Sequence, residues 1–222
     1  MSAVSRETEG LRELEQFLAG PGIERGLIGP READRLWDRH ILNCAVVAWD
    51  NTLVPASARV VDVGSGAGLP GVVWAVARPD LRVSCVESLQ RRATFLSELV
   101  AHLGLGARVS VVRSRAEDLP TGEFDVATAR AVAPLPRLLP WLAPLTRGTV
   151  VAFKGRMAAQ EVAAAAEVAD RLGLTDPEVL QVGGEIVNPP TTVVRYHVRS
   201  TKPEPSTEGL PSGRVLWLER VK

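Results

Sequence analysis

A short apolar strand pattern runs directly into a turn of alternating glycines, and this junction constrains the fold more than any other feature of the chain. Residues 59–63 (Arg-Val-Val-Asp-Val) are mostly β-branched, which is typical of a buried strand. Gly64, Gly66 and Gly68 follow, and Pro70 stands where a helix can begin, because its missing N–H would be unbonded there anyway. Glycines allow a tight turn and let a ligand approach backbone N–H groups at the positive end of the helix. We therefore predict a strand–turn–helix unit that binds a ligand at the turn.

The spacing of these glycines separates two classes of nucleoside-binding turn. The dinucleotide fingerprint has a glycine in its sixth place, where this chain has Leu69, and the third glycine comes one residue earlier. Asp62 followed by Gly-x-Gly-x-Gly instead resembles the first motif of S-adenosylmethionine-dependent methyltransferases. S-Adenosylmethionine is thus the predicted cofactor. A nicotinamide-dependent oxidoreductase on a Rossmann-like fold and a purely structural turn stay open as alternatives.

Strand and helix patterns alternate after the glycine turn, which is the arrangement of a parallel sheet covered on both faces. Strands are predicted at residues 59–63, 82–87, 108–113, 124–128, 149–153, 178–182 and 192–198, and helices at 89–103 and 157–172. The last two strands have no full helix between them and are predicted to be antiparallel. The pattern therefore predicts an α/β fold of the class I (Rossmann-like) methyltransferase type, with a seven-stranded, mostly parallel sheet.

The two ends of the chain differ from this central region. Residues 1–53 have apolar positions at helical spacing, with residues 20–30 between two helices, and are predicted to form an N-terminal helical cap. Residues 54–199 are predicted to form the methyltransferase domain. Residues 200–222 are rich in Pro, Ser, Glu and Gly, which is typical of a flexible extension.

Composition narrows the cellular setting and the partners. The chain has no apolar run long enough for a membrane span and no signal-peptide centre, so a cytoplasmic protein without a membrane partner is predicted. Cys44 and Cys85 have no thiol or histidine nearby at metal-ligand spacing, so no metal site is predicted. A formal net charge of zero argues against field-driven binding of nucleic acid. Residues 86–156, however, carry ten Lys/Arg against six Asp/Glu, which favours one positive face.

Candidate ligand-binding and catalytic residues follow the predicted strands, at the sheet edge where ligands of such folds bind. Glu87 is predicted to accept hydrogen bonds from ribose hydroxyls, and the polar turn at residues 114–118 to hold an adenine. Arg130 and Lys154 are the cations predicted at the reaction edge, and Lys154 is one of three lysines in the chain. A solvated or ion-paired role is the alternative for each cation. His40, beside an apolar helix face, is predicted to be structural rather than catalytic.

The segment after the fourth strand excludes several kinds of methyl acceptor. Enzymes that methylate exocyclic amines usually carry Asn/Asp-Pro-Pro-aromatic there, and those that methylate cytosine carbon carry a cysteine. Residues 129–134 read Ala-Arg-Ala-Val-Ala-Pro and contain neither. Guanine N7 is an acceptor with no proton to remove, so it needs no general base. Catalysis can then rest on positioning and electrostatics.

Nine segments, in order and spacing, carry a resemblance to one known family. They are Arg39–Asn43, Val61–Gly71, Arg78–Pro79, Glu87–Leu89, Arg91–Arg92, Phe95–Leu96, Ser114–Glu117, Ala129–Ala131 and Phe153–Gly155. Over about residues 38–199 the chain resembles the small-subunit ribosomal RNA guanine-N7 methyltransferases, also called glucose-inhibited division protein B. The resemblance implies methylation of one guanine N7 of bacterial 16S ribosomal RNA, within the small ribosomal subunit or its precursor. A monomeric enzyme is expected.

The resemblance also implies particular site residues. The cofactor would be held by Gly64, Leu69, Glu87, Ala116, Glu117 and Arg130. The RNA or catalytic surface would include Arg91, Arg115, Arg130, Lys154 and Arg195. The family's aromatic-Asn and Asn-Leu-Thr segment is absent, residues 20–30 stand in its place, and Arg91 replaces a common lysine. Because the reaction demands no base, a non-catalytic, cofactor-sensing ribosome-assembly factor stays open as a further alternative.

Overall fold

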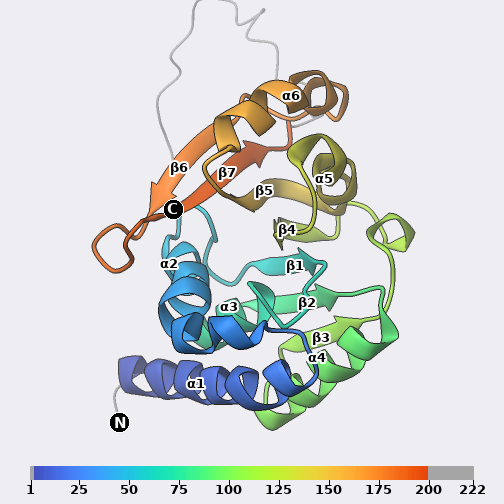
Figure 1. The fold of residues 1–222 in the computed structure, drawn as a ribbon. Coiled ribbons are helices and arrows are strands. Elements are labelled where there is room, and N and C mark those ends of the chain that lie inside the picture. Colours follow the sequence, from blue (N-terminus) through green and yellow to red (C-terminus); the bar gives the residue numbers. More distant parts are fainter. Residues whose placement is uncertain (1–2, 200–222) are drawn as a thin grey trace, which may run out of the picture.

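The computed structural model describes residues 3–199, and a seven-stranded sheet forms the centre of the fold (Figure 1). The strands are β1 (Arg59–Val63), β2 (Arg82–Val86), β3 (Val109–Val112), β4 (Phe124–Arg130), β5 (Thr146–Lys154), β6 (Glu178–Val182) and β7 (Thr191–His197). Their order across the sheet is β3-β2-β1-β4-β5-β7-β6. The strands β1 to β5 pair in parallel, and β7 pairs antiparallel with β5 and with β6. The direction of strand addition reverses between β1 and β4, which is where open α/β sheets bind ligands.

Helices cover both faces of this sheet. The α-helices are α1 (Ala3–Phe17), α2 (Asn43–Trp49), α3 (Gly71–Ala77), α4 (Gln90–His102), α5 (Leu135–Leu142) and α6 (Ala158–Arg171). Two π-helical segments, η1 (Leu18–Gly22) and η3 (Leu36–Leu42), and three 3-10 segments, η2 (Pro30–Arg35), η4 (Ala116–Asp118) and η5 (Ala143–Leu145), join them. One apolar cluster packs α1 to α4 on one face, and a second packs α5 and α6 on the other.

The alternation of side chains along β1 explains the two clusters. Val60 lies in the cluster with α1 to α4, whereas Val61 and Val63 lie in the cluster with α5 and α6. Successive residues of a strand point to opposite faces, so a fully apolar strand is buried on both sides. The strand is central in the sheet, as its composition predicts.

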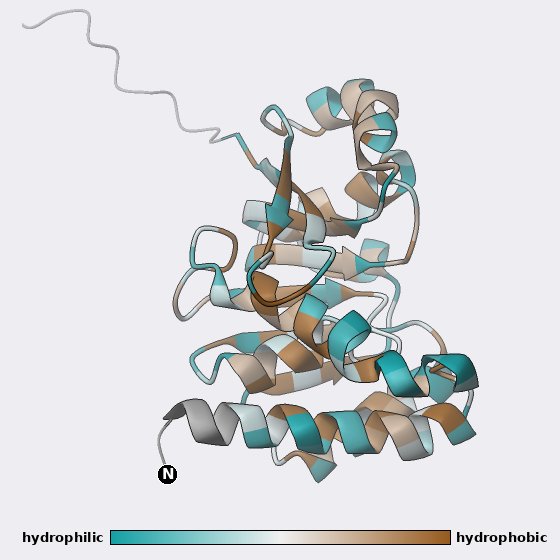
Figure 2. Ribbon diagram, turned by 60° about the vertical axis from the view of Figure 1, so that its left-hand side comes forward, coloured by the Kyte–Doolittle hydropathy of each residue, from teal (hydrophilic) through white to brown (hydrophobic). Residues whose placement is uncertain are grey.

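The N-terminal helices share the core of the sheet. Leu11, Leu14 and Leu18 are buried in the same cluster as Val72 and Trp74 of α3. Hydrophilic residues of α1 alternate with these apolar ones along the helix (Figure 2). The N-terminal helices are therefore part of the same core as the sheet and contribute directly to its stability.

The structure confirms the sheet predicted from the sequence and moves some of its boundaries. The strand β4 continues to Arg130 because that residue still pairs with Phe153, and β5 spans Thr146–Lys154. Arg130 and Lys154 thus end their strands instead of following them.

Residues 20–30 do more than separate two helices, because the amide of Leu27 donates to the carbonyl of Gly22 at 2.9 Å and closes a compact turn. The predicted extension at 200–222 lies outside the described residues, and no helix within residues 3–199 is long and apolar enough to cross a membrane.

Candidate active site

The glycine turn after β1 has three residues in the left-handed region. Gly64, Gly66 and Gly68 have φ values of +73°, +53° and +91°. A Cβ on Gly64 would lie 2.7 Å from Cγ2 of Val132, and one on Gly68 would lie 2.8 Å from Cγ2 of Val72. At Gly66 the nearest atom would be the carbonyl oxygen of Gly64, at 3.7 Å. Packing within the protein therefore requires two of the glycines, whereas a Cβ on the third would make only an ordinary van der Waals contact.

Four amides of this turn donate to carbonyl groups of the protein itself. The N–H groups of Gly64 and Ser65 donate to the carbonyl of Val86 at 2.8 and 3.1 Å. Those of Gly68 and Leu69 donate to the carbonyl of Ser65 at 2.7 and 3.1 Å. These four N–H groups form the turn and fasten it to the end of β2, and contact between the turn and the cofactor stays a prediction.

Asp62 fastens the turn to the helix that follows it. This carboxylate is buried, and its Oδ2 accepts a hydrogen bond from the amide of Gly71 at 2.9 Å. A Cβ at Gly71 would lie 2.8 Å from the same oxygen, so the contact requires glycine there. Oδ1 has no hydrogen-bond partner among the described residues. Burial raises the pKa of Asp62 to about 7, against the lowering effect of the Gly71 hydrogen bond.

Glu87 lies at the end of β2, next to the glycine turn. Its side chain is buried, Oε2 accepts from the amide of Gly66 at 3.2 Å, and Oε1 accepts from the amide of Leu89 at 2.9 Å. A carboxylate has about four acceptor positions. Glu87 is therefore held in place by the backbone and still has lone pairs free to accept hydrogen bonds from the hydroxyl groups of a ligand.

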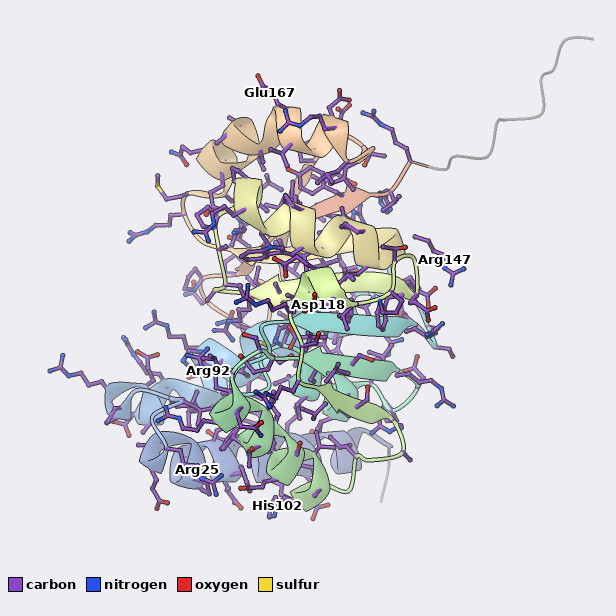
Figure 3. The ribbon with its side chains drawn as sticks, turned by 90° about the vertical axis from the view of Figure 1, so that its right-hand side faces the viewer. Arg25, Arg92, His102, Asp118, Arg147 and Glu167 are labelled. Carbon is purple, nitrogen blue, oxygen red and sulfur yellow. The ribbon has the colours of Figure 1, made fainter. Side chains whose placement is uncertain are left out.

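A cavity of about 240 Å³ opens at the carboxyl ends of β1, β2 and β3. Its lining residues are Val63, Gly64, Val86, Glu87, Ser88, Ser114, Arg115, Ala116, Glu117, Val132 and Trp141. A water molecule takes roughly 30 Å³ in the liquid, so the cavity has room for part of a small organic ligand. Figure 3 labels Arg92 on α4 and Asp118 on η4, the two elements that border this part of the sheet edge.

The cavity brings together five of the residues predicted from the sequence: Gly64, Glu87, Arg115, Ala116 and Glu117. Its apolar wall was not predicted. Val132 follows β4 and Trp141 comes from α5, two segments in which the sequence shows no ligand-binding motif. Their place at the cavity depends on how α5 packs on the sheet, which is a tertiary effect.

Arg130 is turned toward the N-terminal helices. Its guanidinium donates to Nδ1 of His40 at 2.7 Å, to Sγ of Cys44 at 3.0 Å, and to the carbonyls of Arg39 at 3.1 Å and His40 at 3.3 Å. All of these acceptors lie in η3 or at the start of α2. Arg130 therefore fastens the N-terminal helices to the end of β4, while its roles toward cofactor and catalysis stay predictions.

Lys154, at the end of β5, contacts the loop after β4. Its side chain is 7% exposed, and its ammonium donates to the carbonyl of Ala133 at 2.7 Å and pairs with Glu161 at 2.8 Å. Glu161 also accepts from the amide of Leu135 at 2.9 Å. Burial opposes ionisation of Glu161, but the hydrogen bonds from Lys154 and Leu135 lower its pKa overall. Lys154 contacts protein groups here, and a direct contact with RNA stays a prediction.

The remaining predicted RNA-binding cations fall into two kinds. Arg195 is 15% exposed, forms a two-pronged ion pair with Glu178 at 2.7 and 3.0 Å, and donates to the carbonyl of Thr52 at 3.0 Å. Arg91, at the start of α4, and Arg115, at the cavity, are exposed. Only the latter pair is placed to meet a phosphate without first breaking an ion pair.

Comparison with known proteins identifies the family. A family model described as GidB, rRNA small subunit methyltransferase G, matches residues 7–187. The chain belongs to this family. A ribosomal RNA small subunit methyltransferase G of Salinispora tropica is 52% identical over 203 residues, covering 86% of this chain and 83% of the relative. The corresponding protein of a Nocardioides species is 55% identical over 183 residues, covering 81% and 72%.

Solved structures support the fold of this GidB-family chain. The S-adenosylmethionine-dependent methyltransferase SibL in its apo form has a TM-score of 0.59 at 19% identity, with 75% of this chain and 57% of SibL covered. A putative S-adenosylmethionine-dependent methyltransferase of Methanococcus maripaludis has a TM-score of 0.58 at 12% identity, with 79% of this chain and 94% of that protein covered. At this level of identity the likeness establishes the class I methyltransferase fold.

Family membership gives this GidB-family chain S-adenosylmethionine as its cofactor, and the chemistry of the cavity lining suits part of that molecule. Glu87 has a buried carboxylate with free lone pairs, which could accept from ribose hydroxyls, and Val132 and Trp141 present apolar side chains to the cavity. Ala116 and Glu117 border the same space on η4. Family membership excludes the nicotinamide-dependent oxidoreductase.

Proposed function

We propose that this protein transfers a methyl group from S-adenosylmethionine to N7 of a guanine in 16S ribosomal RNA, in the small ribosomal subunit or its precursor. The choice of N7 as the methyl acceptor rests on the composition of the loop after β4. Residues 131–134 offer no carboxylate, thiol or imidazole, and the nearby His40 is bonded through both ring nitrogens, to Arg130 and to Glu32. An acceptor that needs no proton removed, such as guanine N7, suits this edge of the sheet.

The chain's residues act by positioning. The bound cofactor supplies an electrophilic methyl group on a sulfonium. Glu87 orients the ribose, and Val132 and Trp141 keep water from one side of the cavity. Arg130 and Lys154 hold the two ends of the loop that follows β4. The purine N7 lone pair then forms the new N–CH₃ bond as the S–CH₃ bond breaks, and the positive charge passes from sulfur to the purine with no proton transferred.

Exposed arginines near the cavity supply the contacts to RNA in this proposal. Arg115 lines the cavity, and Arg91 stands in the first turn of α4 just beyond Ser88. Such cations neutralise phosphates and release counterions, which supports binding at moderate salt. We propose that the protein acts as a monomer.

Mass-spectrometric mapping of 16S ribosomal RNA from cells with and without the gene tests this proposal. We expect one N7-methylguanosine that is lost with the gene and restored by the active protein. A protein that binds S-adenosylmethionine and RNA but leaves the modification unchanged would be a cofactor-sensing assembly factor, and the proposed chemistry would be abandoned.

A further inference from the structure

His40 stands between an acid and a cation in a geometry that fixes its proton. Its Nδ1 lies 2.7 Å from a guanidinium nitrogen of Arg130, and its Nε2 lies 2.9 Å from a carboxylate oxygen of Glu32. A guanidinium has only donors, so Nδ1 must accept. The proton of the neutral ring is therefore on Nε2, which donates to Glu32. Among the possible forms of the imidazole, this neutral tautomer satisfies both neighbours.

Arg130 connects this imidazole to the wall of the cofactor cavity. Its guanidinium also holds the carbonyls of Arg39 and His40 in the π-helical segment η3. The next residue, Ala131, has a φ of +56°, a left-handed conformation that a non-glycine residue keeps only when its surroundings enforce it. Val132 then packs so closely on the glycine turn that a Cβ on Gly64 would lie 2.7 Å from its Cγ2. The position of Arg130 thus sets the position of Val132 at the cavity.

Protonation of His40 would break this chain of contacts. A doubly protonated ring has no acceptor for Arg130 and adds a positive charge beside the guanidinium. The charged groups that face the ring are Glu32 from η2, Arg130 from β4 and Arg39 from η3 itself. Burial and the charge of Arg130 lower the pKa of His40, and Glu32 opposes them. The pKa of His40 therefore lies below its ordinary value, which favours the neutral ring at neutral pH.

We propose that His40 is a positioning residue for methyl transfer: anchored by Glu32, it fixes Arg130 and, through the strained turn at Ala131, the Val132 wall of the cofactor cavity. This inference rests on the proposed function for its effect on the reaction. Its effect on the cofactor cavity is independent of which molecule receives the methyl group.

The tautomer is the first test. Long-range ¹H–¹⁵N NMR of the full chain with ¹⁵N-labelled histidine distinguishes a protonated ring nitrogen from an unprotonated one, and the His40→Asn spectrum assigns the signal. At pH 7.5 we expect Nε2 protonated and Nδ1 unprotonated. A ring with the proton on Nδ1, or one still doubly protonated at that pH, would overturn the proposal.

The second test measures cofactor binding by titration calorimetry between pH 5 and 8, without RNA. We expect the affinity of the unaltered protein for S-adenosylmethionine to fall about tenfold as His40 protonates, the size of one lost charge-assisted contact. His40→Ala should bind about tenfold more weakly at every pH. His40→Asn should bind within about threefold of the unaltered protein and lose the decline in acid, because its Oδ1 can accept from Arg130 in place of Nδ1 and does not titrate.

Two further variants separate positioning from general stability. Glu32→Gln still accepts from Nε2–H but removes the charge that favours the protonated ring, so the acid decline should move to lower pH. His102→Asn alters an exposed histidine paired with Glu13 on α1 and should leave the pH profile unchanged. The proposal would be overturned if His40→Asn bound S-adenosylmethionine as weakly as His40→Ala at every pH while its melting temperature matched that of the unaltered protein. Loss of RNA methylation with these binding profiles intact would instead contradict the proposed function alone.

Discussion

Gly66 is the residue of the glycine turn that packing leaves free. Its φ of +53° is one that aspartate tolerates better than most side chains, and a Cβ there meets no atom closer than 3.7 Å. Gly66→Asp should therefore keep the fold and lose at least about a hundredfold in affinity for S-adenosylmethionine, because it adds a carboxylate beside the buried Glu87.

Gly104→Asp is the matched control for this variant. Gly104 also has a left-handed φ, of +64°, with no atom within 4 Å of a built Cβ, and lies after α4 away from the cavity. Titration calorimetry should show unchanged affinity for Gly104→Asp. Equal loss in both variants would mean that the turn is disturbed by strain alone.

Asp62 makes the free energy of unfolding depend on pH. Burial raises its pKa from 3.8 to about 7, so between these values the native state binds a proton that the unfolded chain does not. The stability from this group is complete below about pH 4 and is lost as pH rises through 7. The unaltered protein should lose about 3 kcal/mol of unfolding free energy between pH 4.5 and 8 through this group, and Asp62→Asn, which keeps an acceptor for the Gly71 amide, should not show that loss. Urea titrations that give both proteins the same pH dependence would contradict this assignment.

At the scale of elements, α5 contributes the indole of Trp141 to the cavity although its sequence shows only a proline-interrupted apolar pattern. Trp141→Ala should weaken binding of S-adenosylmethionine about tenfold, since it removes apolar contact area from the cavity wall. Trp49→Ala, which alters an exposed tryptophan of α2 outside the cavity, should change the affinity by less than about twofold. Similar losses in both variants would argue against a wall formed by α5.

The sequence predicts the elements that rest on local pattern and misses those that rest on tertiary contact. Strands such as 59–63 and 178–182 appear with the predicted boundaries, because alternation and β-branching are local signals. The π-helical segment at 36–42 has no local signal, and its carbonyls are held by Arg130, some ninety residues away. The site shows the same division. The spacing of residues predicts the glycine turn and Glu87. It does not predict that Lys154 pairs with one acid and Arg195 with another, because both acids lie in other elements.

At the scale of the whole molecule, RNA must be bound by a local face, because the chain has no net charge. Arg115 is exposed at the cavity, so Arg115→Gln should weaken binding of RNA and reduce the salt dependence by about one phosphate contact. Arg195→Gln should leave the salt dependence unchanged and lower stability, because Arg195 is already paired with Glu178. Filter binding across salt concentrations distinguishes the two. A reduced slope for Arg195→Gln would show that its ion pair opens to admit a phosphate.

Single-turnover transfer of a labelled methyl group into small ribosomal subunits from cells that lack the gene tests the central claim most directly. The account predicts one N7-methylguanosine in 16S ribosomal RNA, formed at a rate nearly constant between about pH 6.5 and 9, because N7 has no proton to remove. Transfer to an atom that carries a proton, with a rate that rises steeply through this range, would contradict it.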